Sequence, residues 1–80
     1  MTPLFLAEVF LPDEHTRAAA LQRFREETTS AGARYVRSII VPTDEMCFVL
    51  CDAESAESVK RLGKRAELSF DRAVEAHEDT

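Results

Sequence analysis

The chain has 80 residues, of which 45% are hydrophobic and 31% charged, and its formal net charge at pH 7 is −5. This composition is typical of a globular domain and excludes a disordered chain. The acidic balance disfavours nucleic acid and anionic membranes as the main partners. We expect a single domain over residues 1–80, and a chain this short removes only ~60% of its unfolded surface from water. A second identical subunit is the simplest further source of burial.

The N-terminal residues and the cysteines both favour a cytoplasmic protein. Residues 1–6 lack a basic segment and a cleavage site, and no apolar run approaches the length of a membrane span. Cys47 and Cys51 are four residues apart in a run with strand composition. Their Cα atoms should therefore lie ~13 Å apart, beyond the ~7 Å limit for a disulfide. We predict free thiols, as a reducing cytosol allows.

The first half of the chain predicts a strand followed by a helix. Residues 4–11 are nearly all apolar, which suits a central strand covered on both faces. Asp13 or Thr16 is the expected N-cap of a helix over residues 17–31, and Gly32 is a natural stop. The positions expected to face the core are Ala20, Leu21, Phe24, Thr28 and Ala31.

The second half predicts a hairpin, a helix and a last strand. Residues 35–41 and 46–52 alternate as strands around an acidic turn at 42–45. Ser55 is the expected cap of a second helix, in which Gly63 lies on the apolar stripe and indicates a close backbone approach. Residues 70–77 alternate as a fourth strand.

The order β-α-β-β-α-β predicts an α+β fold, the ferredoxin-like plait. In this fold a four-stranded antiparallel sheet carries two helices on one face. The other face must meet solvent, a ligand or a partner. Two such faces packed together would form a dimeric α/β barrel.

Strand alternation sorts side chains onto the two faces of the sheet. The bulkier set of the third strand, Met46, Phe48 and Leu50, is predicted to face the helices. The open face is predicted to carry Tyr35, Arg37, Ile39 and Cys47. An apolar face with a few polar groups suits a dimer interface or a small-molecule pocket. The candidate ligand-binding residues are Glu8, Tyr35, Arg37 and Cys47.

Glu8 and the thiols are the first groups to weigh as chemical sites. Glu8 is a carboxylate inside an apolar strand, so burial would require a partner or a raised pKa, and Arg37 is the predicted partner. A structural ion pair is favoured over a general base. The cysteines lack a nearby base, which favours small buried hydrophobes over a nucleophile.

The remaining candidates point to surface positions. His15 and His77 are isolated, which favours surface histidines over a metal site. Lys60, Arg61, Lys64 and Arg65 are predicted to form a solvated basic stripe. The third strand lacks the basic-Gly-aromatic start of an RNA-reading strand. No phosphate-binding loop occurs, and neither a cofactor nor a metal is predicted.

The motifs LAEVFLP (residues 6–12), YVRSIIVPTDEMCF (35–48), the segment 52–55 and LSFDRAVEA (68–76) resemble a bacterial family. It is the domain-of-unknown-function family numbered 4242, some of whose members are described as nickel-binding proteins. The resemblance implies a ferredoxin-like subunit that dimerises through its sheet, with no established catalytic activity. Nickel-binding members place histidines on the second strand, where this chain has Arg34 and Arg37, and a guanidinium cannot replace imidazole as a ligand. The residues that fit the commoner family pattern are Glu8, Arg37, Asp44, Glu45, Cys47, Phe70, Asp71 and Arg72.

Three hypotheses follow for the function. The first is a cytoplasmic homodimeric binding or accessory protein that uses the open sheet face, with a small molecule as a further candidate partner. The second is a transition-metal binding protein with His15, His77, Glu8 or the thiols as ligands. The third is a dimeric α/β-barrel enzyme of monooxygenase or isomerase type, with a pocket lined by Glu8 and Arg37. The sequence identifies no catalytic residue.

Overall fold

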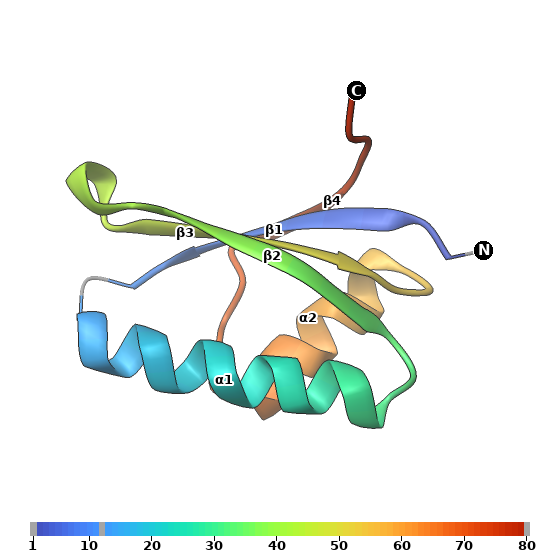
Figure 1. Cartoon of the computed structure of the whole chain (residues 1–80), viewed down its shortest axis with the longest axis horizontal. Coiled ribbons are helices and arrows are strands. Elements are labelled where there is room, and N and C mark those ends of the chain that lie inside the picture. The colour runs from blue at the N-terminus through green and yellow to red at the C-terminus, as the bar shows by residue number, and fades with distance from the viewer. Residues whose placement is uncertain (1, 12, 80) are drawn as a thin grey trace.

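The computed structural model describes residues 2–11 and 13–79, so Pro12, the last residue of the LAEVFLP motif, lies outside the described residues. These described residues form four strands, two α-helices and one short 3₁₀ helix (Figure 1). In chain order they are β1 (Leu4–Phe10), α1 (Glu14–Ser30), β2 (Arg34–Val41), η1 (Pro42–Asp44), β3 (Met46–Asp52), α2 (Ala56–Arg65) and β4 (Arg72–Ala76).

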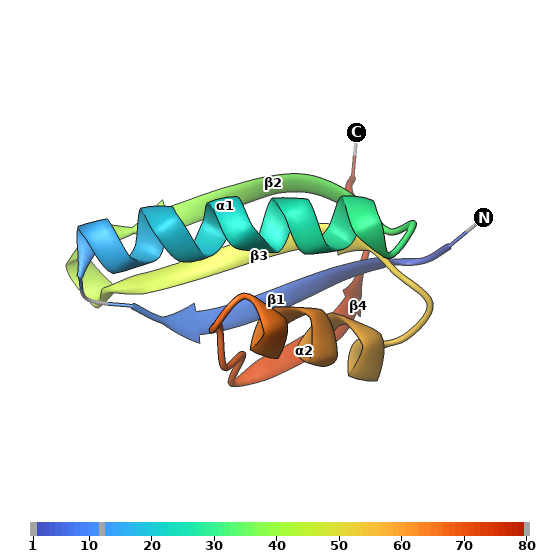
Figure 2. The same cartoon turned by 90° about the horizontal axis from the view of Figure 1, so that it is seen from below.

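The four strands form one antiparallel sheet in the order β2-β3-β1-β4. Both helices lie on the same side of this sheet, as Figures 1 and 2 show from two directions. The β-α-β-β-α-β order and this strand order confirm the predicted ferredoxin-like α+β fold. Within the described part of the chain, no helix lies on the opposite face of the sheet.

Helix α1 begins three residues earlier than predicted because Asp13, and not Thr16, is its N-cap. The Asp13 side chain accepts a hydrogen bond from the backbone N–H of Thr16 at 2.8 Å, which satisfies one of the orphan donors at the helix start. At the other end, Gly32 takes a left-handed conformation with φ of 77°. Ala31, predicted to face the core, is exposed, while the other four positions of the predicted stripe are buried.

The strand predicted over residues 70–77 is shorter, because Phe70 and Asp71 precede it. Phe70 is buried and its ring packs edge-on against Phe24 of α1, with the ring centroids 5.4 Å apart. It also lies directly over Gly63 of α2. A Cβ at position 63 would come within 2.6 Å of the Phe70 ring and 2.8 Å of the Leu68 carbonyl oxygen. The close approach predicted at Gly63 is therefore to the segment before β4.

We expect Gly63→Ala to destabilise the fold although alanine favours helices. The new methyl group must displace an aromatic ring and a backbone carbonyl, and overpacking of this kind costs about 1–3 kcal/mol. Urea unfolding followed by circular dichroism measures the loss. Lys64→Ala, at an exposed position of the same helix, is the control and should change stability by less than about 0.5 kcal/mol. Equal stability of Gly63→Ala and the wild type would contradict this account.

The assignment of the two faces of β3 from side-chain size is wrong. Cys47, Val49 and Cys51 point to the helices and are fully buried, whereas Met46, Phe48 and Leu50 lie on the open face. The helices and the segment before β4 supply the bulk of the core with large side chains. These include Phe24, Leu62, Leu68 and Phe70. Little depth remains beneath β3, where small side chains fit best.

Tyr35 is also on the opposite face from the one predicted, because β2 contains a bulge. The register is Tyr35 opposite Cys51 and then Arg37 opposite Leu50, so Val36 is an extra residue without its own partner. An extra residue reverses the alternation of side chains. Tyr35 therefore packs against the core, while Arg37 and Ile39 lie on the open face as predicted.

The candidate site on the open face of the sheet

The open face of the sheet is built from outward-pointing residues of all four strands. The strand register places these residues in four rows that run from β2 across β3 and β1 to β4. The rows are Arg34-Asp52-Leu4-Ala76, then Arg37-Leu50-Leu6-Val74, then Ile39-Phe48-Glu8-Arg72, and last Val41-Met46-Phe10. We call this set of residues the open face.

The middle of the open face is apolar and uncovered. Phe10 and Ile39 are 54% and 49% exposed, the highest values among the large hydrophobic residues of the described chain. Leu6, Phe48 and Leu50 between them are only half-buried, since each is shielded by its neighbours on the same face alone. Scattered exposed hydrophobics are ordinary in soluble proteins, whereas contiguous exposed apolar patches are typical of interaction surfaces.

The predicted Glu8–Arg37 ion pair does not form within the subunit. Glu8 pairs instead with Arg72, directly opposite on β4, with Nε and Oε2 3.5 Å apart. Arg37 on β2 pairs with Glu78, which follows β4, at 3.3 Å. Both carboxylates and both guanidiniums remain partly exposed to solvent. Glu8 is therefore half-buried and held in an ion pair, with Arg72 in place of the predicted Arg37.

The charged groups of the open face balance only together with Glu78, which follows β4. A third pair, Arg34 with Asp52 at 2.6 Å, joins the two already described. The open face itself carries three guanidiniums and two carboxylates, and Glu78 supplies the third carboxylate, so the face and Glu78 together have no formal charge, although the whole chain carries −5. The excess negative charge of the chain lies elsewhere on the molecule.

Two of the four predicted ligand-binding residues are not on this face. Cys47 is fully buried under the helices. Tyr35 packs against Phe24, with ring centroids 6.4 Å apart, and the guanidinium of Arg25 lies 4.9 Å from its ring centre. Its hydroxyl shares a hydrogen bond with Ser38. Tyr35 and Cys47 are therefore parts of the core and its border, and Glu8 and Arg37 alone remain as candidates on the open face.

The thiols are free and their burial raises their pKa values. Loss of hydration raises the pKa of Cys51 to about 11, with a smaller contribution from the negative charge of Asp52. Burial likewise raises the pKa of Cys47. A thiol that holds its proton this firmly is a poor nucleophile and a poor metal ligand.

This shift predicts a loss of stability in alkali. The folded thiol of Cys51 keeps its proton up to about pH 11, whereas an unfolded thiol releases it near pH 8.5, so the stabilisation is complete below pH ~8.5 and disappears as the pH rises towards 11. We expect the free energy of unfolding to fall by about 3 kcal/mol over this range. Urea unfolding at several pH values measures the decrease. In Cys51→Ala the decrease should be smaller, and an identical pH profile would contradict the assignment.

The histidines lie at exposed positions, His15 in the first turn of α1 and His77 just after β4. Within residues 2–11 and 13–79, no three His, Cys, Asp or Glu side chains lie close enough to hold a metal ion together. In the same part of the chain, no helix is long and apolar enough to cross a membrane.

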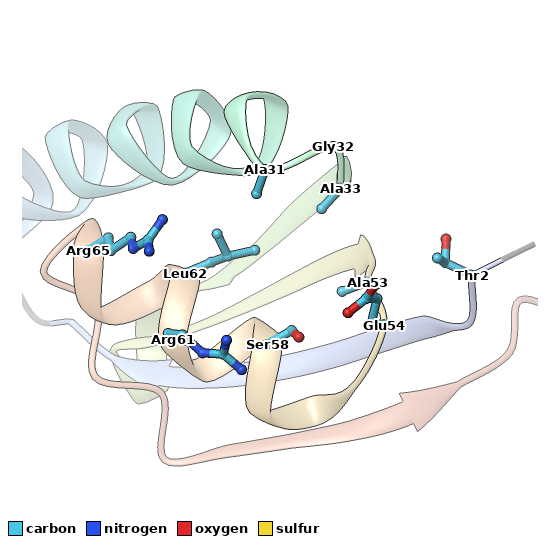
Figure 3. A pocket seen from close by; sticks show the side chains of 10 residues that line it. All are labelled: Thr2, Ala31, Gly32, Ala33, Ala53, Glu54, Ser58, Arg61, Leu62 and Arg65. Carbon is cyan, nitrogen blue, oxygen red and sulfur yellow. The ribbon is translucent and has the colours of Figure 1, made fainter.

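Among the described residues, two of the clefts beside the sheet stand out, and neither is lined by Glu8 or Arg37. One, of about 430 Å³, lies at the end of the open face between the start of β1 and the residues after β4. The other, of about 350 Å³, lies in the helical layer between the end of α1 and one side of α2 (Figure 3). Sequence reasoning missed Ser58, Arg61 and Arg65 of this second cleft. Their spacing in the sequence could have predicted that they line one surface, because residues 58, 61, 62 and 65 share one face of a helix.

The architecture defines a class: a small α+β domain of the ferredoxin-like type, with one helical layer and one bare sheet face. The sequence matches no protein-family model and no curated protein. Among solved structures, SCO4226 from Streptomyces coelicolor A3(2) is similar in fold, with a TM-score of 0.69 over 96% of this chain and 99% of that one. The two sequences are 18% identical, so the likeness establishes the shared fold alone.

Proposed function

We propose that this protein is a homodimeric binding or accessory protein whose two subunits meet through their open faces. The observation that carries the proposal is the contiguous apolar surface around Phe48 and Leu50, with Phe10 and Ile39 about half exposed. Surfaces of this size on an isolated subunit mark sites of association. A domain of 80 residues gains the burial that it lacks on its own.

The size of the open face suits a dimer. Strand β1 has seven residues, a length of ~24 Å, and four strands span ~19 Å. The projected area is therefore about 450 Å² per subunit, and the relief of the side chains raises the accessible area above this value. The smallest stable interfaces bury about 600 Å² per partner, so nearly the whole face must take part.

Charge favours a second copy of this chain as the occupant. Two molecules with a formal charge of −5 repel each other, so a contact between them requires a part of the surface without net charge. A partner whose surface is mainly acidic or mainly basic would find no attractive charge on such a face. Because the open face together with Glu78 carries equal numbers of acidic and basic groups, two copies can meet there without a charge penalty.

The chain end does not prevent this contact. After β4 the chain rises from the sheet on the side away from the helices (Figure 1), where Glu78 pairs with Arg37. Since β2 and β4 are the outer strands, this pair reaches across part of the open face. Exposed ion pairs contribute about 0–1 kcal/mol. A second subunit can therefore displace Glu78 from Arg37, or pair with it, at little cost.

The family resemblance and the free thiols support a bacterial, cytoplasmic protein of this kind. In the proposed dimer, Glu8 and Arg37 line the space between the two sheets and are the polar groups available to a small molecule held there. Sedimentation velocity and native mass spectrometry test the proposal. We expect a species of twice the subunit mass of 9.0 kDa. A species of 9.0 kDa at every protein concentration from ~1 to ~100 μM, which spans the usual range of Kd for such interfaces, would overturn it.

A further inference from the structure

The cleft between α1 and α2 has the chemistry of a binding site for a small organic anion. Its floor and one wall are apolar, from Ala31, Ala33, Ala53 and Leu62. Its other wall carries Ser58, Arg61 and Arg65 along one side of α2 (Figure 3). The volume of about 350 Å³ lies within the range of small-molecule sites, about 300–1,000 Å³.

The cleft exists because the chain after α1 has only small side chains. The residues that leave α1 are Ala31, Gly32 and Ala33, and they border the cleft on the side opposite α2. A Cβ built at Gly32 meets no atom within 4 Å, which shows that the space beside this turn is open. Larger side chains at the end of α1 would close the gap between the two helices.

The charges of the lining favour one negative group. Among the lining residues, Arg61 and Arg65 stand against one carboxylate, Glu54, so the lining itself has a formal charge of +1 within an acidic protein. Arg65 is engaged by Glu27 at 3.8 Å. Within residues 2–11 and 13–79, no carboxylate lies within 4 Å of the Arg61 guanidinium, which leaves its donors available.

We propose that this cleft binds a small monocarboxylate with a short apolar tail. The carboxylate takes the planar fork of Arg61 and the hydroxyl of Ser58, and the tail lies on Leu62 and the three alanines. A guanidinium matches a carboxylate with two parallel hydrogen bonds. A phosphate dianion fits less well, because it brings a second charge towards Glu54 and the carbonyl end of α1.

The site is independent of the proposed dimer. It lies in the helical layer, on the other side of the sheet from the open face (Figures 1 and 3). Both sites remain accessible at the same time. A variant that prevents dimer formation should leave ligand binding in the cleft unchanged, so failure of either proposal is recognised separately.

Nuclear magnetic resonance titration of the full chain with sodium hexanoate tests the proposal. We expect saturable shifts of backbone amides at residues 31–33, 53–54 and 58–65, with a Kd of about 1 mM, as is usual for a fragment of this size. Arg61→Gln should weaken binding about tenfold. Ala31→Leu, at an exposed position with helical backbone, narrows the cleft and should also weaken binding.

The controls test separately the charge of the ligand, its apolar tail and the position of the binding arginine on α2. Lys60→Gln removes the neighbouring charge outside the cleft and should bind hexanoate as the wild type does. Hexanol, which has the same tail without the charge, and inorganic phosphate, which has charge without a tail, should not saturate. The proposal is overturned if hexanoate causes no saturable shift, if the shifts fall elsewhere, or if hexanol or phosphate binds as tightly. Equal losses in Lys60→Gln and Arg61→Gln would also overturn it.

Discussion

Phe24→Ala is expected to remove most of the stability of the domain. Phe24 is fully buried at the centre of the helical layer, where its ring meets Phe70 edge-on at 5.4 Å and Tyr35 at 6.4 Å. Deleting a buried phenyl ring costs about 3–5 kcal/mol. A domain of this length has a total stability of only about 4–12 kcal/mol. Partial or complete unfolding at room temperature is the expected result.

Urea unfolding at a fixed protein concentration measures this loss, because the stability of the proposed dimer would depend on concentration. Phe24→Leu is the matched control. It removes the aromatic contacts but keeps most of the volume, and it should lose about 1 kcal/mol. A loss below about 1 kcal/mol in Phe24→Ala would show that α1 is not anchored to the sheet through this residue.

The order of elements was predictable because local chemistry determines it. Asp13 and Ser55 are N-caps whose side chains accept bonds from Thr16 and Ser58, and the apolar stripes of both helices follow the helical period. With both crossovers right-handed, this order of elements predicts the ferredoxin-like topology. The sequence did not decide whether Asp13 or Thr16 is the N-cap of α1, since both residue types are favoured at that position.

The faces of the strands were not predictable by the same means. Alternation sorts residues into two sets but does not say which set faces the helices. Side-chain size predicted the wrong face for Cys47 and Phe48. The depth of the core beneath β3 depends on Phe24, Leu68 and Phe70, which are distant from β3 in the sequence. The bulge at Val36 then moved Tyr35 to the core side, and no local signal in the sequence marks that bulge.

This reversal strengthens the case for association. Had Phe48 faced the helices, the open face would have carried small side chains and thiols, which suit a solvated surface. The structure instead places Phe48, Leu50 and Met46 outward, beside Leu6 and Phe10. The observed orientation of β3 takes Cys47 out of the candidate site, and it also makes the open face more apolar than predicted.

Phe48→Asp is expected to convert the proposed dimer into a monomer. Phe48 lies between Ile39 and Glu8 on a central strand of the open face. An aspartate there removes an apolar anchor and adds a negative charge next to Glu8, and a twofold axis brings the same change to the opposing surface. Loss of a central aromatic contact costs about 2–4 kcal/mol, which raises the dimer Kd by about 30-fold to 1,000-fold.

Sedimentation velocity over a range of concentrations measures the shift from twice 9.0 kDa to 9.0 kDa. The fold should survive, because Phe48 lies outside the core between sheet and helices, and an unchanged circular dichroism spectrum verifies this. Ala19→Asp, an equal change of charge at an exposed position of α1, is the matched control and should remain dimeric. If both variants dissociate equally, general repulsion explains the effect. If neither dissociates while the wild type is a dimer, the subunits meet through another surface. A monomer only for Phe48→Asp places the interface on the open face.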